Sequence, residues 1–398
     1  MNKPSEKRKA VALLSGGLDS RLAVKMMLEQ GIEVEAVNFV TIFCTCTAKS
    51  SCKSEARAAA EEFGIPLKVL NATGEILAAV RNAKHGYGRG LNPCLDCRIS
   101  MFRRAGRYMQ ETGADFIVTG EVWGERPMSQ RPDALGVIER ESGLEGLIVR
   151  PLSAHLFEPS IPEQEGWVDR RRMMAIQGRS RKPQIQLAAE LGIGDYPCPA
   201  GGCLLCDRNF AGRLKRLLDE DPQPPIADIQ VLKLGRLFIS SEGNRILIPR
   251  NEEETRRLTA LARPGDLLMS AEGFMGPTTV IKGNPISEAT LREAAALTAR
   301  YGQGRDAGSV TVSYTPVTDG RATRVPQPQL GGLHVSCNPV ADGGATTSVA
   351  NPDLQNSADG GAAGSDGAIP DGNAQEEDGR LEISPADGWR LAEELERL

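Results

Sequence analysis

The feature that most constrains the fold is a glycine-rich turn between an apolar run and a helical pattern, close to the start of the chain. The run Ala10–Leu14 is short and continuously apolar, which is typical of a buried strand in a parallel sheet. The hexapeptide SGGLDS at 15–20 follows it directly, and the apolar residues of 21–30 then recur at helical spacing. The glycines therefore lie on a strand-to-helix turn, where backbone N–H groups and the helix dipole favour an anion.

The side chains of this turn indicate a phosphate site that includes a metal ion. Gly16 and Gly17 allow the backbone to approach a phosphate closely, and Ser15 and Ser20 offer hydroxyl donors. Asp19 would repel phosphate oxygens unless a divalent cation such as Mg²⁺ bridges them. A turn with only a structural role is the alternative, but all six positions between a strand and a helix favour a nucleotide site.

Apolar runs and helical patterns alternate along the first half of the chain. Further strands are expected at residues 34–39, 66–70, 114–119 and 147–152, with helical segments between them. This alternation predicts an α/β fold with a doubly wound parallel sheet, whose ligands bind at the carboxyl ends of the strands. Gly120 follows one such strand, so we expect it to line the same crevice as the turn at 15–20.

Cysteines provide the second strong signal. The chain has nine of them and begins with a charged segment that lacks the apolar core of a secretory signal, so we expect a cytoplasmic protein whose thiols serve metal or redox chemistry. Cys94 and Cys97 form a C-x-x-C pair at the start of a helical pattern, where a thiol pKa is lowered. A second group contains Cys198, Cys203 and Cys206. A four-cysteine zinc site and a [4Fe–4S] cluster held by three cysteines both fit these spacings.

Three further cysteines follow the second expected strand. Cys44, Cys46 and Cys52 have a spacing that is not common for zinc or clusters, so we expect small buried thiols there.

Several motifs resemble a known superfamily of enzymes. The hexapeptide at 15–20 resembles the S-G-G-x-D-S loop of PP-loop ATP pyrophosphatases, which cleave ATP between its α- and β-phosphates and adenylate a carbonyl oxygen. Residues 92–97 (NPCLDC) and 201–205 (GGCLL) resemble tRNA 2-thiouridylases, and 119–130 (TGEVWGERPMSQ) resembles 4-thiouridine synthetases, with Glu125 in place of the usual glutamine. The resemblance covers residues 10–210.

The resemblance implies ATP-dependent tRNA uridine thiolation, in which an adenylated uridine oxygen is replaced by sulfur from sulfide or a persulfide carrier. It implies that the catalytic residues are Asp19, Cys94 and Cys203. It implies that ATP and Mg²⁺ are bound by Ser15, Gly16, Gly17, Asp19, Ser20 and Gly120. It also implies a [4Fe–4S] cluster held by Cys94, Cys97 and Cys203, with Cys198 or Cys206 as alternate ligands and zinc as the alternative metal.

The pattern changes after residue 222. Short strands at 232–239 and 245–249 flank a turn signal, and helical patterns at 252–262 and 287–301 complete a small α+β domain. Residues 264–283 and 292–315 resemble the NFACT-type RNA-binding domain, which implies contact with tRNA. A dimerisation or lid domain is the alternative, so a homodimer stays open.

Composition separates a tail from the body. Thirteen acidic and three basic residues lie between Val325 and the end of the chain, whereas residues 1–324 carry 44 basic and 39 acidic residues. We expect domains at 1–222 (PP-loop) and 226–324 (RNA binding), a disordered acidic linker at 325–380 and a short helix at 381–398. No apolar run approaches the ~18 residues of a membrane span, so no membrane partner is expected.

Two basic clusters could contact RNA phosphates or could form a solvated surface. One lies on the helical segment 98–108, and the other includes residues 170–172, Arg179, Arg181 and Lys182.

Two other functions remain open. One is a PP-loop ligase or amidotransferase, in which ammonia or an amine attacks the adenylate. The other is an RNA-binding factor in which ATP and zinc have structural roles.

Overall fold

The computed structural model of the chain describes residues 7–45, 52–194, 196, 202–283, 285–318 and 379–383. The chain divides into two compact units, Met1–Gln223 and Pro224–Leu398, which are described in turn. Among the described residues, none of the helices combines the length and the apolar character that crossing a bilayer requires.

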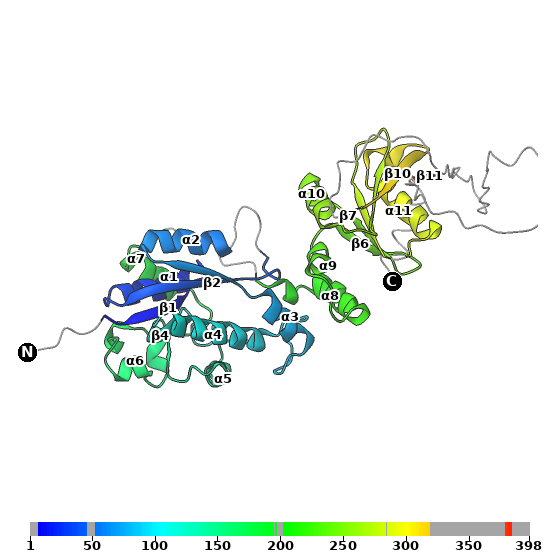
Figure 1. Cartoon of the computed structure of the whole chain (residues 1–398). Helices are drawn as coiled ribbons and strands as arrows, with labels where there is room; N and C mark the ends of the chain where they lie inside the picture. The colour runs from blue at the N-terminus through cyan, green and yellow to red at the C-terminus, as the bar shows by residue number, and fades with distance from the viewer. Residues whose placement is uncertain are drawn as a thin grey trace, which may run out of the picture. The chain divides into compact units, whose positions relative to one another are not determined.

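The N-terminal unit is built on a five-stranded sheet in which every neighbouring pair is parallel (Figure 1). The strand order is β3-β2-β1-β4-β5, so the order reverses beside β1, between β1 and β4. Crevices for ligands form at such a reversal, at the carboxyl ends of the strands. The doubly wound α/β fold expected from the alternating pattern is therefore confirmed. The strands are β1 (Lys9–Leu13), β2 (Glu33–Val40), β3 (Leu67–Asn71), β4 (Phe116–Thr119) and β5 (Ile148–Val149).

Helices cover both faces of this sheet (Figure 1). Since successive strand residues point to opposite faces, Ala10 and Ala12 of β1 join a buried cluster with α1, α2 and α7, whereas Val11 joins a second cluster with Phe102 of α4 and Ile138 of α5. The helices of this unit are α1 (Leu18–Leu28), α2 (Cys52–Phe63), α3 (Thr73–Arg81), α4 (Cys94–Glu111), α5 (Pro132–Ser142), α6 (Ile161–Gln164), α7 (Lys182–Glu190) and α8 (Arg208–Glu220).

The C-terminal unit contains an antiparallel six-stranded sheet in the order β11-β10-β8-β9-β7-β6. Its core packs α11 against the sheet, with Ala295 and Leu297 of the helix in one buried cluster with Ile246 and Ile281. The expected small α+β domain is confirmed. The elements are α9 (Ile226–Val231), β6 (Arg236–Ile239), β7 (Arg245–Ile248), α10 (Glu252–Leu261), β8 (Leu267–Ala271), β9 (Thr279–Lys282), α11 (Glu288–Arg300), β10 (Val310–Pro316) and β11 (Gly379–Ile383).

One strand was not expected. β11 pairs antiparallel with β10, although its residues fall at the end of the expected acidic linker and the start of the expected short helix. The pairing partner supplies hydrogen bonds that the local composition does not reveal, because strand formation depends on tertiary context. The remainder of the expected linker, 325–378, and of the expected helix, 384–398, lies outside the described residues.

Candidate active site

The turn at 15–20 connects β1 to α1 and is held against α2. Gly16 has a φ of +82°, and a Cβ built on it would lie 2.5 Å from the backbone carbon of Glu55. Only glycine combines this conformation with so close an approach. The Nε–H of Arg21, which is buried, donates to the carbonyl oxygen of Gly16 at 3.0 Å and braces the turn from behind.

The hydroxyl groups of Ser15 and Ser20 form further contacts within the turn. Ser20 Oγ donates to the carbonyl oxygen of Gly17 at 2.9 Å, and Ser15 Oγ lies 3.1 Å from Ser20 Oγ. Ser15 therefore lies in the loop at the carboxyl end of β1 and Ser20 lies in the first turn of α1, with their hydroxyl groups close together.

Asp19 is held in a partly buried position that is costly for a carboxylate. Its Oδ1 atom is buried and has no hydrogen-bond partner among the described residues. Burial raises the pKa of this carboxyl, and the guanidinium groups of Arg181 and Arg126 partly oppose the shift. Burial and the nearby Asp19 likewise raise the pKa of Glu125. Two carboxylates and two guanidinium groups therefore lie near one another, a combination that suits a divalent cation and phosphate oxygens.

Sequence reasoning did not assign Arg126 or Arg181 to this site. Arg126 follows Glu125 within the 119–130 motif, so the motif could have indicated it. Arg181 stands immediately before α7, and sequence reasoning grouped it only with a basic cluster for RNA or solvent. No local pattern reveals its partner, because α7 packs on α1 only in the folded chain.

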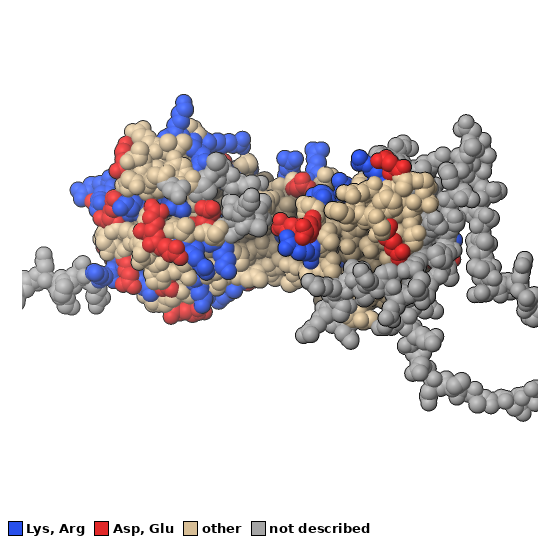
Figure 2. Space-filling model, turned by 90° about the horizontal axis from the view of Figure 1, so that it is seen from above, with Lys and Arg blue, Asp and Glu red and all other residues tan. Residues whose placement is uncertain are grey.

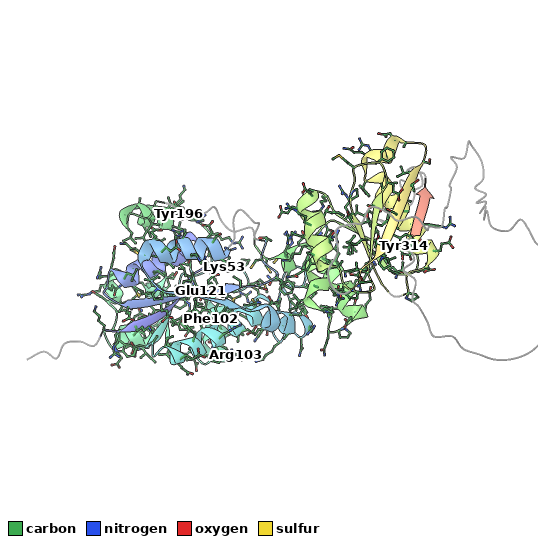
Figure 3. The ribbon with its side chains drawn as sticks, turned by 45° about the horizontal axis from the view of Figure 1, so that its top comes forward. Lys53, Phe102, Arg103, Glu121, Tyr196 and Tyr314 are labelled. Atoms are coloured by element: carbon green, nitrogen blue, oxygen red, sulfur yellow. The ribbon has the colours of Figure 1, made fainter. Side chains whose placement is uncertain are left out.

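Gly120, the residue after β4, packs against the turn at 15–20. A Cβ on Gly120 would lie 2.5 Å from the backbone carbon and oxygen of Asp19, so the loop after β4 lies directly against the turn. Glu121, which Figure 3 labels, is 2% exposed. It forms ion pairs with Arg98 and with Arg150, whose Nε lies 3.1 Å from Glu121 Oε2. Burial alone would raise the pKa of Glu121, but Arg98 and then Arg150 hold it below its ordinary value.

The ion pair between Glu121 and Arg98 places Glu121 next to the C-x-x-C motif, because Arg98 directly follows Cys97 on α4. Cys94 is the first residue of α4, and the N–H of Cys97 donates to the carbonyl oxygen of Pro93 at 2.8 Å. The turn at 15–20, Gly120, Glu121 and the start of α4 thus form one continuous series of contacts.

The distal cysteines are joined to the same helix start. The N–H of Leu91 donates to the carbonyl oxygen of Leu205 at 2.9 Å, and Asn92 Nδ2 donates to Cys206 Sγ at 3.1 Å. Cys203 therefore lies beside the C-x-x-C motif although the two are about a hundred residues apart in sequence. Cys198 lies outside the described residues.

Cys44 also belongs to this group of thiols. Cys44 forms an isolated antiparallel bridge with Cys203, although the two residues belong to segments that are far apart in the chain. The expectation of a small buried thiol is wrong for Cys44, which is only half-buried. Cys46 lies outside the described residues, and Cys52 is the first residue of α2.

The thiols influence one another and are poorly solvated. Burial raises the pKa of Cys97 to about 12, with Cys94 the next cause, and Cys203 and Cys44 add smaller contributions. Burial likewise raises the pKa of Cys203 to about 11. The lowered thiol pKa expected from the helix start is therefore wrong for Cys97, because loss of water outweighs the helix dipole and Arg98.

The expected cluster or zinc ion needs several thiols arranged around one point. Sulfur donors suit both. However, among the described residues no three histidine, cysteine, aspartate or glutamate side chains are arranged to hold a metal ion. The described thiols do not form a preformed metal site, so the [4Fe–4S] cluster and the zinc alternative stay predictions, and no chemical step below depends on them.

The expected basic clusters are largely engaged within the protein. Arg103 donates to the carbonyl oxygen of Glu141, Arg104 pairs with Glu75 and Arg170 pairs with Glu163, all within 2.9 Å. On the face that Figure 2 shows, basic side chains are interspersed with acidic ones. These observations favour structural and solvated roles for much of the two clusters.

Two protein families match separate parts of the chain. Residues 5–155 match the family described as Thiamine biosynthesis protein (ThiI), and residues 235–328 match the family described as NFACT protein RNA binding domain.

Curated relatives match the N-terminal half. The tRNA-specific 2-thiouridylase MnmA of Pseudomonas fluorescens is 26% identical over 232 residues, which cover 55% of this chain and 58% of that protein. The same protein of Stutzerimonas stutzeri is 28% identical over 229 residues, which cover 54% of this chain and 57% of that protein. The chain thus spans less than two thirds of the length of these relatives.

Solved structures are similar at a greater distance. A crystal structure of a 4-thiouridine synthetase–RNA complex with bound ATP is 24% identical, with a TM-score of 0.30 and coverage of 47% of this chain and 52% of that chain. A predicted subunit of tRNA methyltransferase from Methanocaldococcus jannaschii is 14% identical, with a TM-score of 0.32 and coverage of 55% and 90%.

The family matches agree with the PP-loop and thiol motifs in the N-terminal unit and with the α+β fold of the C-terminal unit. The chain therefore combines a ThiI-type PP-loop domain with an NFACT-type RNA-binding domain and is distantly similar to tRNA 2-thiouridylases.

Proposed function

We propose that the protein is an ATP-dependent sulfurtransferase that converts a uridine of tRNA to thiouridine. The observation that carries this proposal is the series of contacts from the turn at 15–20, through Gly120 and Glu121, to Arg98 and the thiols of α4. A phosphate loop can bind the ATP that activates an oxygen, and a thiol beside it can carry, as a persulfide, the sulfur that replaces that oxygen. The similarity to 2-thiouridylases supports the same chemistry.

The first half of the reaction is adenylation. In our proposal, the turn at 15–20 binds the phosphates of ATP through its backbone N–H groups and through the hydroxyls of Ser15 and Ser20. Asp19, whose Oδ1 has no hydrogen-bond partner in the described part of the chain, would hold the Mg²⁺ ion that accompanies the nucleotide. Arg126 and Arg181 would stabilise the charge that develops on the departing pyrophosphate.

The second half replaces the adenylated oxygen with sulfur. In our proposal, Cys203 carries the incoming sulfur as a persulfide, and Cys94 is a further reacting thiol. The ion pair between the buried Glu121 and the partly exposed Arg98 positions the start of α4. A partly buried site favours this step because water would otherwise hydrolyse the adenylate.

The C-terminal unit is proposed to bind the tRNA. Its match to the NFACT RNA-binding family supports this role. We assign ATP and sulfur chemistry to residues 1–222 and RNA binding to residues 226–324.

Reconstitution tests the function. Purified protein would be incubated with tRNA, ATP, Mg²⁺ and a sulfide or persulfide donor, and pyrophosphate, AMP and thiouridine would be quantified. We expect all three products to depend on tRNA. Pyrophosphate and an aminated nucleoside, in a parallel reaction with ammonium in place of the sulfur donor, would indicate an amidotransferase. ATP binding without turnover would indicate the RNA-binding factor.

Analysis of the anaerobically purified protein tests the cofactor. About four irons with matching acid-labile sulfide, lost in Cys203→Ala, would support the [4Fe–4S] cluster. Stoichiometric zinc without iron would support the alternative metal, and an active metal-free protein would leave the thiols alone to transfer sulfur.

A further inference from the structure

Cys44 lies opposite Cys203, although neither the sequence motifs nor the family resemblance assigns it a role. It belongs to the segment that follows β2, whereas Cys203 belongs to the segment that precedes α8. Two hydrogen bonds fix the segments together. The N–H of Leu204 donates to the carbonyl oxygen of Phe43 at 2.9 Å, and Thr45 Oγ1 donates to the carbonyl oxygen of Gly202 at 3.0 Å.

Aromatic packing supports the same contact. Phe43 is fully buried, and its ring lies edge-on to that of Phe210 in α8 with 6.2 Å between the ring centroids. Residues on both sides of Cys44 therefore anchor the segment, so its position opposite Cys203 does not depend on one bond.

The register of this bridge places the two sulfur atoms on the same side. The bridging hydrogen bond joins the flanking residues Phe43 and Leu204 rather than the cysteines themselves, so the cysteines form a non-hydrogen-bonded antiparallel pair. In such pairs the Cα atoms are about 4.5 Å apart and the side chains are close. That separation falls within the range of about 4.4–6.8 Å that a disulfide spans.

The other thiols near Cys203 are placed less favourably for exchange with it. Of the described cysteines, Cys44 is the one that pairs with Cys203 in a bridge, whereas Cys97 lies in the first turn of α4 and Cys206 lies in the short turn that follows Cys203. Cys94 lies at the start of α4 and is the main competitor, because the proposed function already makes it a reacting thiol.

We propose that Cys44 is the resolving thiol of sulfur transfer, which forms a disulfide with Cys203 as thiouridine is released. This inference rests on the proposed function. It adds a catalytic residue that lies outside both cysteine motifs.

Sulfur transfer and release take two displacements. The terminal sulfur of a persulfide on Cys203 attacks the adenylated uridine carbon, and AMP leaves with the electron pair of the C–O bond. Cys44, as a thiolate that has lost its proton to solvent, then attacks Cys203 Sγ. The bond between Cys203 Sγ and the transferred sulfur breaks, and its electron pair forms the thiocarbonyl of thiouridine. A dithiol reductant supplies the two electrons that reopen the Cys44–Cys203 disulfide, and a persulfide donor reloads Cys203.

The first experiment tests the disulfide without tRNA, so it does not depend on the proposed function. The reduced full-length protein is oxidised with diamide, the remaining thiols are alkylated, and peptides are sequenced by mass spectrometry without reduction. We expect a Cys44–Cys203 disulfide in the wild type and in the matched control Cys46→Ser, and its loss in Cys44→Ser. A Cys94–Cys203 disulfide with Cys44 alkylated would overturn the inference.

The second experiment follows one turnover. Protein loaded with a persulfide by sodium polysulfide receives tRNA and ATP without reductant. We expect Cys44→Ser to release pyrophosphate as the wild type does but to retain the tRNA in an adduct that dithiothreitol cleaves. Cys46→Ser should release thiolated tRNA normally.

Normal release of thiolated tRNA by Cys44→Ser would overturn the role of Cys44 while leaving the proposed function intact. If the wild type produced neither pyrophosphate nor thiouridine, the proposed function itself would fail, and the disulfide result would still stand on its own.

Discussion

At the scale of single residues, the site contains charges that the fold holds at a cost. Among the residues that the structure describes, Asp19 Oδ1 is buried without a hydrogen-bond partner, and burial raises the pKa of the Asp19 carboxyl. A group whose pKa is raised by folding favours its protonated form in the folded state, so its charge at neutral pH lowers stability. Groups of this kind persist at functional sites because ligands compensate for them.

We predict that Asp19→Asn separates stability from activity. Removal of the buried charge should leave the thermal unfolding midpoint unchanged or raised, because the amide keeps the shape of the carboxyl. Pyrophosphate release should fall about 100-fold or more, because the proposed Mg²⁺ ligand is lost. Calorimetry and a pyrophosphate assay measure both effects, and a variant with normal pyrophosphate release would contradict the role of Asp19.

Glu121 shows the opposite behaviour, because Arg98 and Arg150 hold its pKa below the ordinary value of 4.5. A carboxyl whose pKa is lowered by folding stabilises the protein at any pH above the pKa of that carboxyl in the unfolded state. This stability is lost as the pH falls through the pKa of the carboxyl in the folded state.

We predict that Glu121→Gln lowers the free energy of unfolding at neutral pH by about 1–3 kcal/mol, because the partly exposed Arg98 loses the Glu121 carboxylate and the buried Arg150 keeps only Glu139. The loss of stability on acidification should also be smaller in the variant than in the wild type. Urea unfolding at neutral and acid pH measures this. The control is Asp133→Asn, whose exposed pair with Arg131 should contribute about 0–1 kcal/mol. Parallel pH profiles for Glu121→Gln and the wild type would refute the argument.

Sequence could indicate the residues that lie in contiguous motifs. Residues 15–20 and the C-x-x-C pair carry their chemistry in local spacing, so the structure finds them on a turn and at a helix start as expected. Arg181 and Cys44 acquire their partners only through packing of α7 on α1 and through a bridge between distant segments. No local pattern encodes such contacts.

At the scale of elements, the parallel strands were predictable because continuous apolar runs alternate with helical patterns. The start of β6 was less so. Leu232 and Leu234 were expected within a strand, but they follow α9, and β6 begins only at Arg236. Both leucines are buried. A buried strand and a buried helix end both require apolar residues, so hydrophobicity alone does not distinguish these two structures.

The contact between the loops after β1 and β4 gives a prediction for an element. Gly120→Ala would place a Cβ 2.5 Å from the backbone of Asp19, so one loop must move. We expect weaker ATP binding and slower pyrophosphate release. The control is Gly74→Ala in α3, where a Cβ meets no atom within 4 Å.

The control should keep full activity and gain about 0.4–1 kcal/mol of stability, since alanine restricts the unfolded chain. Isothermal titration with a non-hydrolysable ATP analogue compares the two variants. Equal ATP affinity in both would show that the close approach of these loops is unimportant.

At the scale of the whole molecule, each unit has its own buried clusters. The N-terminal unit carries the proposed ATP and thiol chemistry, and the C-terminal unit matches an RNA-binding family. Because the cores are separate, each unit should fold when it is produced without the other.

We predict that a protein truncated after Gln223 binds ATP normally but binds tRNA weakly. The dependence of tRNA affinity on salt concentration should also become less steep, because fewer phosphates are contacted. Filter binding over a range of salt concentrations measures both, with calorimetry to verify folding. Unchanged affinity and salt dependence would instead support a dimerisation role for the C-terminal unit.

The central claim is that this protein thiolates a uridine of tRNA with ATP. Nucleoside mass spectrometry of tRNA from a strain that lacks the gene tests it most directly, with complementation by the wild type and by Asp19→Asn. The account predicts that one thiouridine disappears, returns with the wild-type gene and does not return with the variant. Wild-type amounts of every thiouridine in the deletion strain would contradict it.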